Sequence, residues 1–358
     1  MKRLAALLAF ATVAVMVSTA VNTQATAQDD RPYLMTASTI TLPDDFTDAV
    51  PVAIVDTGDV LLNGSIEGVA SVLLWRDGAF SRLSAPTRQS HATAMHRNGQ
   101  VVGWVMGDDE EPIAAILEEG RFIEMPGADT GSRAFGTNGE NGLVGEALFE
   151  ESDQRSVPVY WTSTSVEVLP GITEDSTGRA HDVNTIGQIA GWIAPTGDLE
   201  DSGRATLWFG NQITDLGLQI DGWSAAFAIN ETGQVVGVAE SVGADDGKSV
   251  TTATLWQDGQ PGDLGVPDGF DWAEAVDISD SGLIVGTAGT GRFGSIGGVT
   301  TAVLWTVNDR FDLNESTAGL NAIQLTAAVS VNTFGQILCA GLDEAGRAQV
   351  VILTVLGN

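Results

Sequence analysis

The chain has 358 residues, with 47 Asp and Glu against 16 Lys and Arg, and a formal net charge of −31. This acidity argues against nucleic acid and anionic membranes as partners, because binding phosphate needs clustered Lys and Arg. The single cysteine, Cys339, excludes an intramolecular disulfide. The fold must therefore be held by its core, and a chain of this length can bury a large one.

Residues 1–27 have the pattern of a cleaved export signal. Lys2 and Arg3 precede an apolar run that begins at Leu4, and Ala25-Thr26-Ala27 fits a small-residue cleavage site. A transmembrane anchor is the alternative, but an apolar run of about 18 residues is marginal for spanning a bilayer. We therefore predict an exported protein, periplasmic or extracellular, with no membrane span after the signal is removed.

A repeated motif follows the signal. Its clearest copy runs from Ala226 to Gly237 and reads AFAINETGQVVG. The copies begin at Pro51, Ala92, Ala134, Ala180, Ala226, Ala275 and Ala328. Each copy is followed by a second motif, as in Ala253-Thr-Leu-Trp-Gln-Asp-Gly259 and then Asp263-Leu-Gly265. Self-similarity with a period of about 40–50 residues is typical of repeat architectures.

Each repeat unit is predicted to form four short strands, because β-branched and aromatic residues dominate and no long helical period occurs. In the clearest unit these strands are residues 226–230, 234–238 and 252–256, with a fourth at Asp263-Leu264. The segment Asn230-Glu-Thr-Gly233 predicts a type I turn between the first two, since Asn bonds within the turn and Gly accepts the left-handed conformation. Four-stranded units of this length are typical of a β-propeller.

The two ends of the chain indicate how the ring closes. The last unit stops after its third strand, residues 350–355, while residues 38–43 resemble a fourth strand that has no third strand before it. We therefore predict an all-β fold: a seven-bladed β-propeller with four antiparallel strands per blade, closed by 38–43 in the last blade. A stacked β-solenoid is the alternative, but it would leave both ends unexplained and would keep exposed sheet edges.

This prediction makes residues 28–358 a single β-propeller domain, and we expect it to be monomeric. Its repeat units lie near residues 44–82, 83–127, 128–170, 171–217, 218–265, 266–314 and 315–358.

The paired motifs, AxAINxxGQVVG and then AxLWxxG with DLG, resemble those of the bacterial extracellular HAF repeat family. The resemblance covers residues 38–356, although Ala-Thr-Leu-Trp and Ala-Val-Leu-Trp replace the usual His-Ala-Phe before Leu-Trp. It implies a repeat architecture and assigns no ligand or catalytic residue.

The variable connections between strands are expected to share one face of the propeller, and function in repeat folds usually lies on such loops. Trp223 and Trp272 precede the first strands of successive units, close to Asp residues and outside the repeated Trp position. An exposed Trp beside carboxylates can stack on a sugar ring or a cation. The alternative is that both Trp side chains pack beneath loops.

Asp182 and Asp277 replace a small residue in the first strand, the strand nearest the predicted axis, and His181 adjoins Asp182. A His–Asp pair beside a channel could act in acid–base chemistry or bind a metal. The alternative is a hydrogen-bonded substitution at a degenerate repeat position.

Acidic loops make calcium a candidate ligand, and we predict no other cofactor. These loops are 108–111, 150–153, 198–201 and 245–246. The segment from Asp198 resembles the start of a calcium loop, but Phe209 stands where the bidentate Glu belongs.

No catalytic signature occurs in the sequence, and we predict no catalytic residue. We therefore predict a non-enzymatic binding or scaffold propeller that uses the variable-loop face to bind a protein, a glycan or a divalent cation. The alternative is an extracellular carbohydrate-active enzyme, a hydrolase or lyase, that uses carboxylates on that face.

Overall fold

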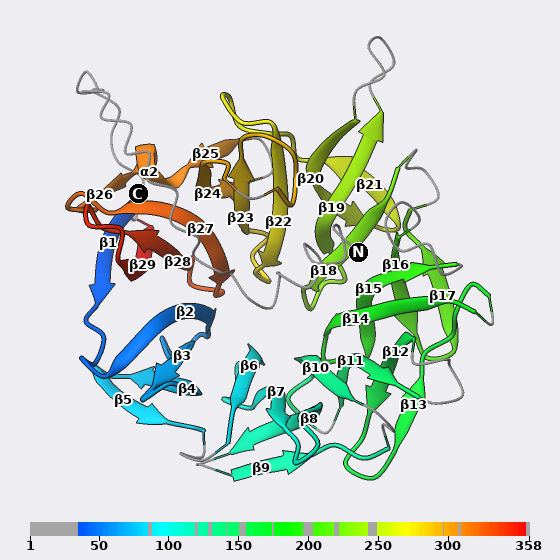
Figure 1. Ribbon diagram of the computed structural model, residues 1–358. Coiled ribbons are helices and arrows are strands. Elements are labelled where there is room, and N and C mark those ends of the chain that lie inside the picture. The colour runs from blue at the N-terminus through cyan, green and yellow to red at the C-terminus, as the bar shows by residue number, and fades with distance from the viewer. Residues whose placement is uncertain are drawn as a thin grey trace.

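The computed structural model describes residues 35–355 except 85–87, 119–120, 128–130, 141, 150–154, 174, 196–202, 218–221, 243–248, 296 and 307–308. The predicted signal, residues 1–27, lies outside the described residues. Seven sheets, antiparallel except for one short edge pairing in the last blade, stand around a central channel (Figure 1), and in each sheet the first strand of the blade lies innermost. The predicted seven-bladed propeller is confirmed.

The strands have the following bounds. Blade one contains β2 (Phe46–Ile54), β3 (Val60–Ile66), β4 (Val69–Arg76) and β5 (Ala79–Arg82). Blade two contains β6 (Ser90–Met95), β7 (Val101–Met106), β8 (Pro112–Glu118) and β9 (Arg121–Glu124). Blade three contains β10 (Ser132–Thr137), β11 (Leu143–Leu148), β12 (Ser156–Trp161) and β13 (Val166–Val168). Blade four contains β14 (Thr177–Val183), β15 (Gln188–Ala194), β16 (Arg204–Phe209) and β17 (Gln212–Asp215).

The remaining blades follow the same plan. Blade five contains β18 (Ser224–Ile229), β19 (Val235–Val242), β20 (Ser249–Gln257) and β21 (Gln260–Asp263). Blade six contains β22 (Trp272–Ile278), β23 (Ile284–Gly289), β24 (Thr300–Trp305) and β25 (Arg310–Asp312). Blade seven contains β27 (Gln324–Val331), β28 (Gln336–Leu342), β29 (Ala348–Val355) and β1 (Met35–Ile40), with α2 (Leu313–Ser316) and β26 (Thr317–Ala318) before it.

The first strand of the chain closes the ring. β1 pairs antiparallel with β29, with Ala37 opposite Leu353, and β26 adds a short parallel pairing on its other edge. Figure 1 shows β1, in blue, within the otherwise red and orange last blade. The strand begins three residues before the predicted segment 38–43. It ends before Pro43, which cannot donate a ladder hydrogen bond and whose carbonyl instead accepts from Phe46 in a turn.

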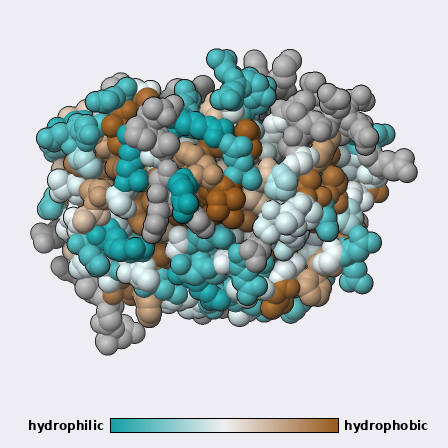
Figure 2. Space-filling model, turned by 90° about the horizontal axis from the view of Figure 1, so that it is seen from below, coloured by the Kyte–Doolittle hydropathy of each residue, from teal (hydrophilic) through white to brown (hydrophobic). Residues whose placement is uncertain are grey.

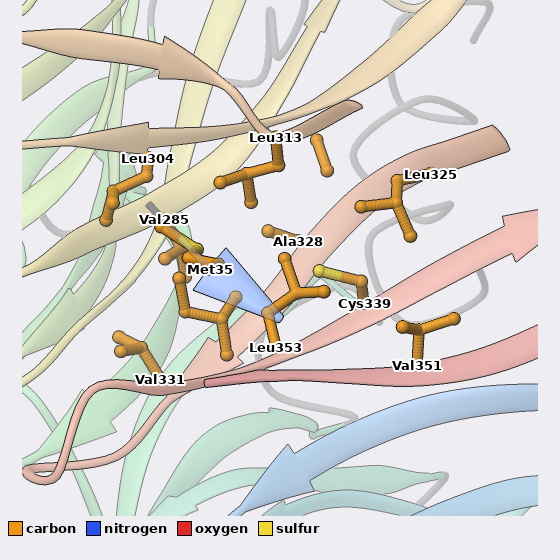
Figure 3. Close-up of a cluster of buried hydrophobic side chains, with 12 residues drawn as sticks. Met35, Val285, Leu304, Leu313, Leu325, Ala328, Val331, Cys339, Val351 and Leu353 are labelled. Atoms are coloured by element: carbon orange, nitrogen blue, oxygen red, sulfur yellow. The ribbon is translucent and has the colours of Figure 1, made fainter. Parts of the chain in front are cut away.

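Met35 anchors the closing strand in the core. Its side chain is 1% exposed and packs in the cluster that joins blades six and seven, near Val285, Ala328 and Leu353 (Figure 3). Burying an apolar side chain of this size stabilises the fold by about 1.5–3 kcal/mol.

In blades three, four and five, the repeated Trp joins the blade to the preceding one. Nε1 of Trp161, Trp208 and Trp256 donates to the carbonyl oxygens of Pro126, Pro170 and Leu216 respectively, at 2.9–3.2 Å. Each acceptor lies just after the outermost strand of the previous blade. The indole rings are at most 1% exposed, so these side chains combine apolar burial with one satisfied polar group.

In blades four, five and seven, the repeated Asn joins the blade to the following one. In blade five, Gly233 N donates to Asn230 O at 3.1 Å, and Gly233 has a φ of 82°, as the predicted turn requires. The Asn230 amide then donates to Ser279 O in blade six. Asn184 and Asn332 make the corresponding bonds to the next blades, Asn332 across the closure to Val55 O.

The outer surface of the ring is mixed in character. Figure 2 shows one edge, where hydrophilic side chains surround separate hydrophobic patches. Large exposed apolar side chains include Val168 on β13 and Phe334 in a turn of blade seven; single residues of this kind are common on protein surfaces. Within the part of the chain that the structure describes, no helix is long and apolar enough to cross a membrane.

Replacing Met35 by Ala tests the closing strand. We expect the free energy of unfolding to fall by about 2–5 kcal/mol, because the truncation leaves a cavity at the closure. The matched control is Ser38→Ala, an exposed position on the same strand, for which we expect a change within about 0.5 kcal/mol. Urea denaturation of the mature protein measures both, and equal effects would contradict this role of β1.

The indole hydrogen bond can be isolated by comparing two Trp→Phe variants. Trp208 and Trp305 are equally buried, but Trp305 Nε1 meets no hydrogen-bond partner among the described residues. We expect Trp208→Phe to lose about 1 kcal/mol more stability than Trp305→Phe, because only the first variant breaks a hydrogen bond. Chemical denaturation measures the difference, and a larger loss for Trp305→Phe would refute the assignment.

Candidate functional site in the central channel

Every innermost strand carries a β-bulge at the same repeat position. In blade five the register between β18 and β19 shifts between Ala226 and Ala228, so Phe227 is the extra residue. The other six blades shift at the equivalent place. A bulge re-aims the side chain of its extra residue, and here it turns that side chain toward the channel.

The bulge also explains the Gly that ends the first motif. A Cβ on Gly237 would lie 2.1 Å from Ala225 O, and one on Gly286 would lie 2.0 Å from Glu274 O. Because the bulged strand comes so close, only Gly fits opposite it in these blades. The motif therefore sets the shape of the channel wall as well as the strand pairing.

The bulge residues form a ring that we call the waist ring. Its members are Val52, Thr93, Phe135, His181, Phe227, Val276 and Val329. All seven line both channel cavities that the structure shows. The His181 ring lies 5.6 Å from Phe135 and 5.5 Å from Phe227, and burial lowers the pKa of His181 to about 3, so the ring is neutral at neutral pH. The waist ring is therefore an uncharged, largely apolar band of the channel wall that borders both cavities.

Below the waist ring, toward the constant turns, lies a cavity of about 290 Å³ that we call the turn-end cavity. Asp182 and Asp277 line it, as expected for the strand nearest the axis. Asp182 accepts hydrogen bonds from Val183 N and, in the next blade, from Ile229 N. Asp277 does the same for Ile278 N and Val331 N. Both carboxyl groups therefore join neighbouring blades.

Burial sets the protonation of these two carboxyl groups. It raises the pKa of Asp182 to about 6, against the lowering effect of the two backbone N–H groups, and the nearby Asp277 raises it further. Burial also raises the pKa of Asp277. Ser330 occupies the equivalent position in blade seven and accepts from Ile54 N of blade one. These bonds support the interpretation that both Asp residues are hydrogen-bonded substitutions at a repeat position.

An arginine spans the turn-end mouth of the channel. Arg97, in the first turn of blade two, lies 3.6 Å from Glu231 of blade five and 3.6 Å from Asp280 of blade six. These blades stand across the ring from blade two (Figure 1). The side chain therefore lies over the opening of the turn-end cavity.

Above the waist ring, toward the variable loops, lies a second cavity of about 220 Å³ that we call the loop-end cavity. Its distinctive lining comes from the residue before the small residue of each first strand. This set, the rim ring, is Val50, His91, Arg133, Arg179, Ala225, Glu274 and Ala327. Five of these line the cavity, including His91, Arg179 and Glu274. The rim ring thus places apolar, aromatic, basic and acidic side chains at one level of the channel.

A buried ion-pair cluster supports one side of the loop-end cavity. Glu146 is 3% exposed, lies 2.8 Å from Arg179 and 3.1 Å from Arg133, and accepts from Ser156. Burial alone would raise the pKa of Glu146, but Arg179, Ser156 and Arg133 together hold it below its ordinary value. Arg179 also lies 4.6 Å from the centre of the Phe135 ring. The guanidinium of Arg179 is therefore held rigidly at the cavity wall.

Glu274 lies elsewhere on the same wall, without such support. The residue is 6% exposed, and Oε2 has no hydrogen-bond partner among the described residues. Burial raises the pKa of Glu274 to about 8. Burial therefore favours the protonated form of the side chain, and a buried carboxyl oxygen left without a hydrogen-bond partner costs about 1–3 kcal/mol.

His91 and Asn63 complete the polar lining on the side of blades one and two. Asn63 Nδ2 donates to Ala92 O at 2.8 Å, and its Oδ1 accepts from Ala92 N. The His91 ring stacks on Trp104 at 5.4 Å. Burial lowers the pKa of His91 to about 4, so this ring too is neutral at neutral pH.

The predicted site residues fall into two groups. His181, Asp182 and Asp277 line the channel, as described above. Trp223 and Trp272 instead meet Phe293, which follows β23, at ring distances of 5.6 and 5.1 Å.

The two indoles also differ in exposure. Trp223 is only 9% exposed and packs with Trp192, whereas Trp272 is half-buried. Packing beneath a loop accounts for this geometry, and neither Trp lines either cavity.

The calcium hypothesis stays a prediction. Among the described residues, no group of three or more His, Cys, Asp or Glu side chains could hold a metal ion. The acidic segments 150–153, 198–201 and 245–246 lie outside the described residues, and so does the partial calcium-loop match.

Sequence reasoning missed Arg179, Glu146 and Glu274. The available signal was the rim ring itself, where the copies carry Val, His, Arg, Arg, Ala, Glu and Ala beside an otherwise regular motif. Charged residues in a strand that the fold buries are rare unless they are paired or functional.

No family model and no curated protein matches the chain, so its resemblance to HAF repeats stays a prediction. Among solved structures, the chain is similar to the β-propeller domain of the trilobed protease from Pyrococcus furiosus, described as having an open velcro topology. The TM-score is 0.55 at 10% identity, over 87% of this chain and 98% of that one. A likeness at this identity shows the propeller fold alone.

Two peptidases are also similar in structure. A puromycin-hydrolysing peptidase from Mycobacterium tuberculosis gives a TM-score of 0.49 at 11% identity, over 92% of this chain and 56% of that one. An acylaminoacyl peptidase from Pyrococcus horikoshii gives 0.46 at 13% identity, over 84% and 51%. The chain thus spans about half the length of each peptidase.

The raised pKa of Glu274 predicts a pH-dependent stability. The unfolded carboxyl group loses its proton near pH 4.5 and the folded one near pH 8. The contribution of Glu274 is therefore fully present below pH 4.5 and lost as pH rises through 8. We expect Glu274→Gln to be less sensitive to pH across this window than the wild type, by a few kcal/mol, as measured by urea denaturation.

The control for this experiment is Glu67→Gln, which removes the same charge at an exposed turn and should keep the wild-type pH profile. Asp182 and Asp277 titrate in the same direction but are present in all three proteins. A Glu274→Gln profile identical to that of the wild type would show that the Glu274 carboxyl ionises normally.

Proposed function

We propose that this protein is a non-enzymatic binding propeller that takes a small molecule into the loop-end cavity. The observation that carries the proposal is Glu274, which lines the loop-end cavity and whose Oε2 has no hydrogen-bond partner among the described residues. A ligand that hydrogen-bonds to it would relieve the cost of that burial. Concave sites with a few converging polar groups on apolar walls are typical of ligand pockets.

The distribution of the variable residues supports the same function. The rim ring varies in residue type around the channel, whereas the bulge beside it recurs in all seven blades. The cavity opens toward the variable loops, the face where the sequence predicts ligand binding. We propose an exported location for this activity, in the periplasm or outside the cell, in keeping with the predicted signal.

The geometry favours binding over glycoside hydrolysis. Hydrolysis of this kind uses two carboxyl groups that flank the scissile bond. Among the described residues, Glu274 is the one carboxyl group that lines the loop-end cavity, and Glu146 is engaged by two arginines. The packing of Trp223 and Trp272 against Phe293 likewise favours a ligand in the channel over a sugar stacked on these indoles.

A thermal-shift screen of small metabolites tests this function. We expect some compounds to raise the melting temperature of the wild type, because a ligand that binds only the folded state stabilises it. Val50→Trp should abolish these shifts, since Val50 lines the loop-end cavity and the indole would fill it.

The matched control for the screen is Val168→Trp, the same change at an exposed position on an outer strand, which should behave as the wild type. Shifts that persist in Val50→Trp would place the ligand elsewhere. Conversion of a bound compound to product would replace the binding function by an enzymatic one.

A further inference from the structure

We propose, on the basis of the proposed function, that the loop-end cavity binds a small uncharged carboxamide, whose amide group hydrogen-bonds to Glu274 and whose apolar body contacts the waist ring. Three features of the cavity wall favour this ligand class. They are its incomplete hydrogen bonding, the apolar surroundings of Glu274 and the engagement of Arg179 by Glu146.

Two polar groups of the cavity wall have incomplete hydrogen bonding. Glu274 Oε2 and His181 Nε2 are buried atoms, and neither has a hydrogen-bond partner among the described residues. The two side chains come from blades six and four, and both line the loop-end cavity. A hydrocarbon would leave both atoms without partners, which is unfavourable for buried polar groups. A ligand that carries polar atoms therefore fits the cavity better than a hydrocarbon.

The part of the wall that surrounds Glu274 is largely apolar. Val276 follows it on β22, Phe227 comes from blade five and Val329 from blade seven, and all three line the same cavity. Burial is the cause that raises the pKa of Glu274, with no contribution from a charged neighbour. Burying a charge in such surroundings costs far more than burying a neutral polar group. The wall therefore favours an uncharged ligand group beside Glu274.

Ionic ligands of either sign fit this site less well. Nε and Nη2 of Arg179 already donate to Glu146 Oε2, at 3.0 and 2.8 Å, so a ligand carboxylate would compete with Glu146 for the guanidinium. An ammonium group would need Glu274 to ionise, and the loss of hydration of both charges would offset their attraction. An amide at Glu274 leaves the Arg179–Glu146 ion pair intact.

An amide also complements the Glu274 carboxyl group in either protonation state. A protonated carboxyl group has an O–H donor and a carbonyl acceptor, and a primary amide has the matching C=O acceptor and N–H donor. Two parallel hydrogen bonds can then form, and an ionised carboxyl group would still accept from the amide N–H. The last torsion of a Glu side chain is broad, so the carboxyl group can turn toward the ligand.

The size and floor of the cavity limit the rest of the ligand. The volume of about 220 Å³ lies below the range of about 300–1,000 Å³ that is usual for drug-sized ligands. The waist ring beside Glu274 presents Phe227, Val276 and Val329, a surface that suits an apolar or aromatic body. Benzamide combines a primary amide with one aromatic ring, so it serves as the probe.

Three probes of matched shape test the ligand class: benzamide, benzoate and benzylamine. We expect calorimetry at pH 7 to show that the wild type binds benzamide at least about tenfold more tightly than either ion. Val50→Trp should abolish the binding of benzamide, because Val50 lines the same cavity. Val168→Trp, at an exposed position, should bind benzamide as the wild type does.

Two variants of Glu274 test the contact with the amide. Glu274→Leu has a side chain of similar size without hydrogen-bonding atoms, so we expect it to fold and to bind benzamide about tenfold more weakly. Glu274→Gln keeps a donor and an acceptor and should retain benzamide affinity within about threefold. The control is Glu167→Leu, the same change at an exposed position on β13. Equal affinity of the wild type and Glu274→Leu for benzamide would overturn the role of Glu274.

The remaining outcomes distinguish failure of this inference from failure of the proposed function. Preferential binding of benzylamine or benzoate, abolished by Val50→Trp, would show an ionic ligand class and leave the binding function intact. If none of the probes binds at millimolar concentration while the screen finds ligands sensitive to Val50→Trp, the amide class is wrong and the function stands. If both experiments fail, both proposals fall.

Discussion

The antiparallel pairing of β1 with β29 is the contact on which the ring depends. Without it, the last blade would have three strands and an open edge, and residues at the two ends of the chain would not meet. The pairing brings Met35 into the core between blades six and seven. Because the channel is lined by one strand from each blade, its shape follows from the closure of the ring.

Side-chain hydrogen bonds also join neighbouring blades, some to the preceding blade and some to the following one. In blades three to five the repeated Trp reaches back to the preceding blade, and in blades four, five and seven the repeated Asn reaches forward to the next one. At the junction of the last and first blades, Asn332 and Ser330 make the same forward contacts to Val55 and Ile54. The seam therefore carries the same forward Asn hydrogen bond as the junctions after blades four and five, and all seven blades share one channel.

The same repeat motif builds the candidate site indirectly. Its terminal Gly allows the bulged strand to approach closely, and the bulge directs one residue per blade into the waist ring. The rim ring lies one step before the small motif residue, where strand pairing places few demands on the side chain. Polar groups such as Arg179 and Glu274 can occupy this ring because the backbone around them is already satisfied.

Local pattern was enough to determine the number of blades, the strand order, the Asn–Gly turn and the closing strand, since these depend on short-range spacing and on the alternation of small, apolar and turn residues. Only the tertiary structure decided which side chains share the channel. Arg179 and Glu274 come from blades four and six, and closure of the ring brings both into the wall of the loop-end cavity. Glu146 comes from β11 of blade three, and its contact with Arg179 depends on the packing of two neighbouring blades. The tertiary structure also places Trp223 and Trp272 away from the channel that Asp182 and Asp277 line. The bulge and the pleat set the direction of each side chain, and sequence spacing reveals neither of them.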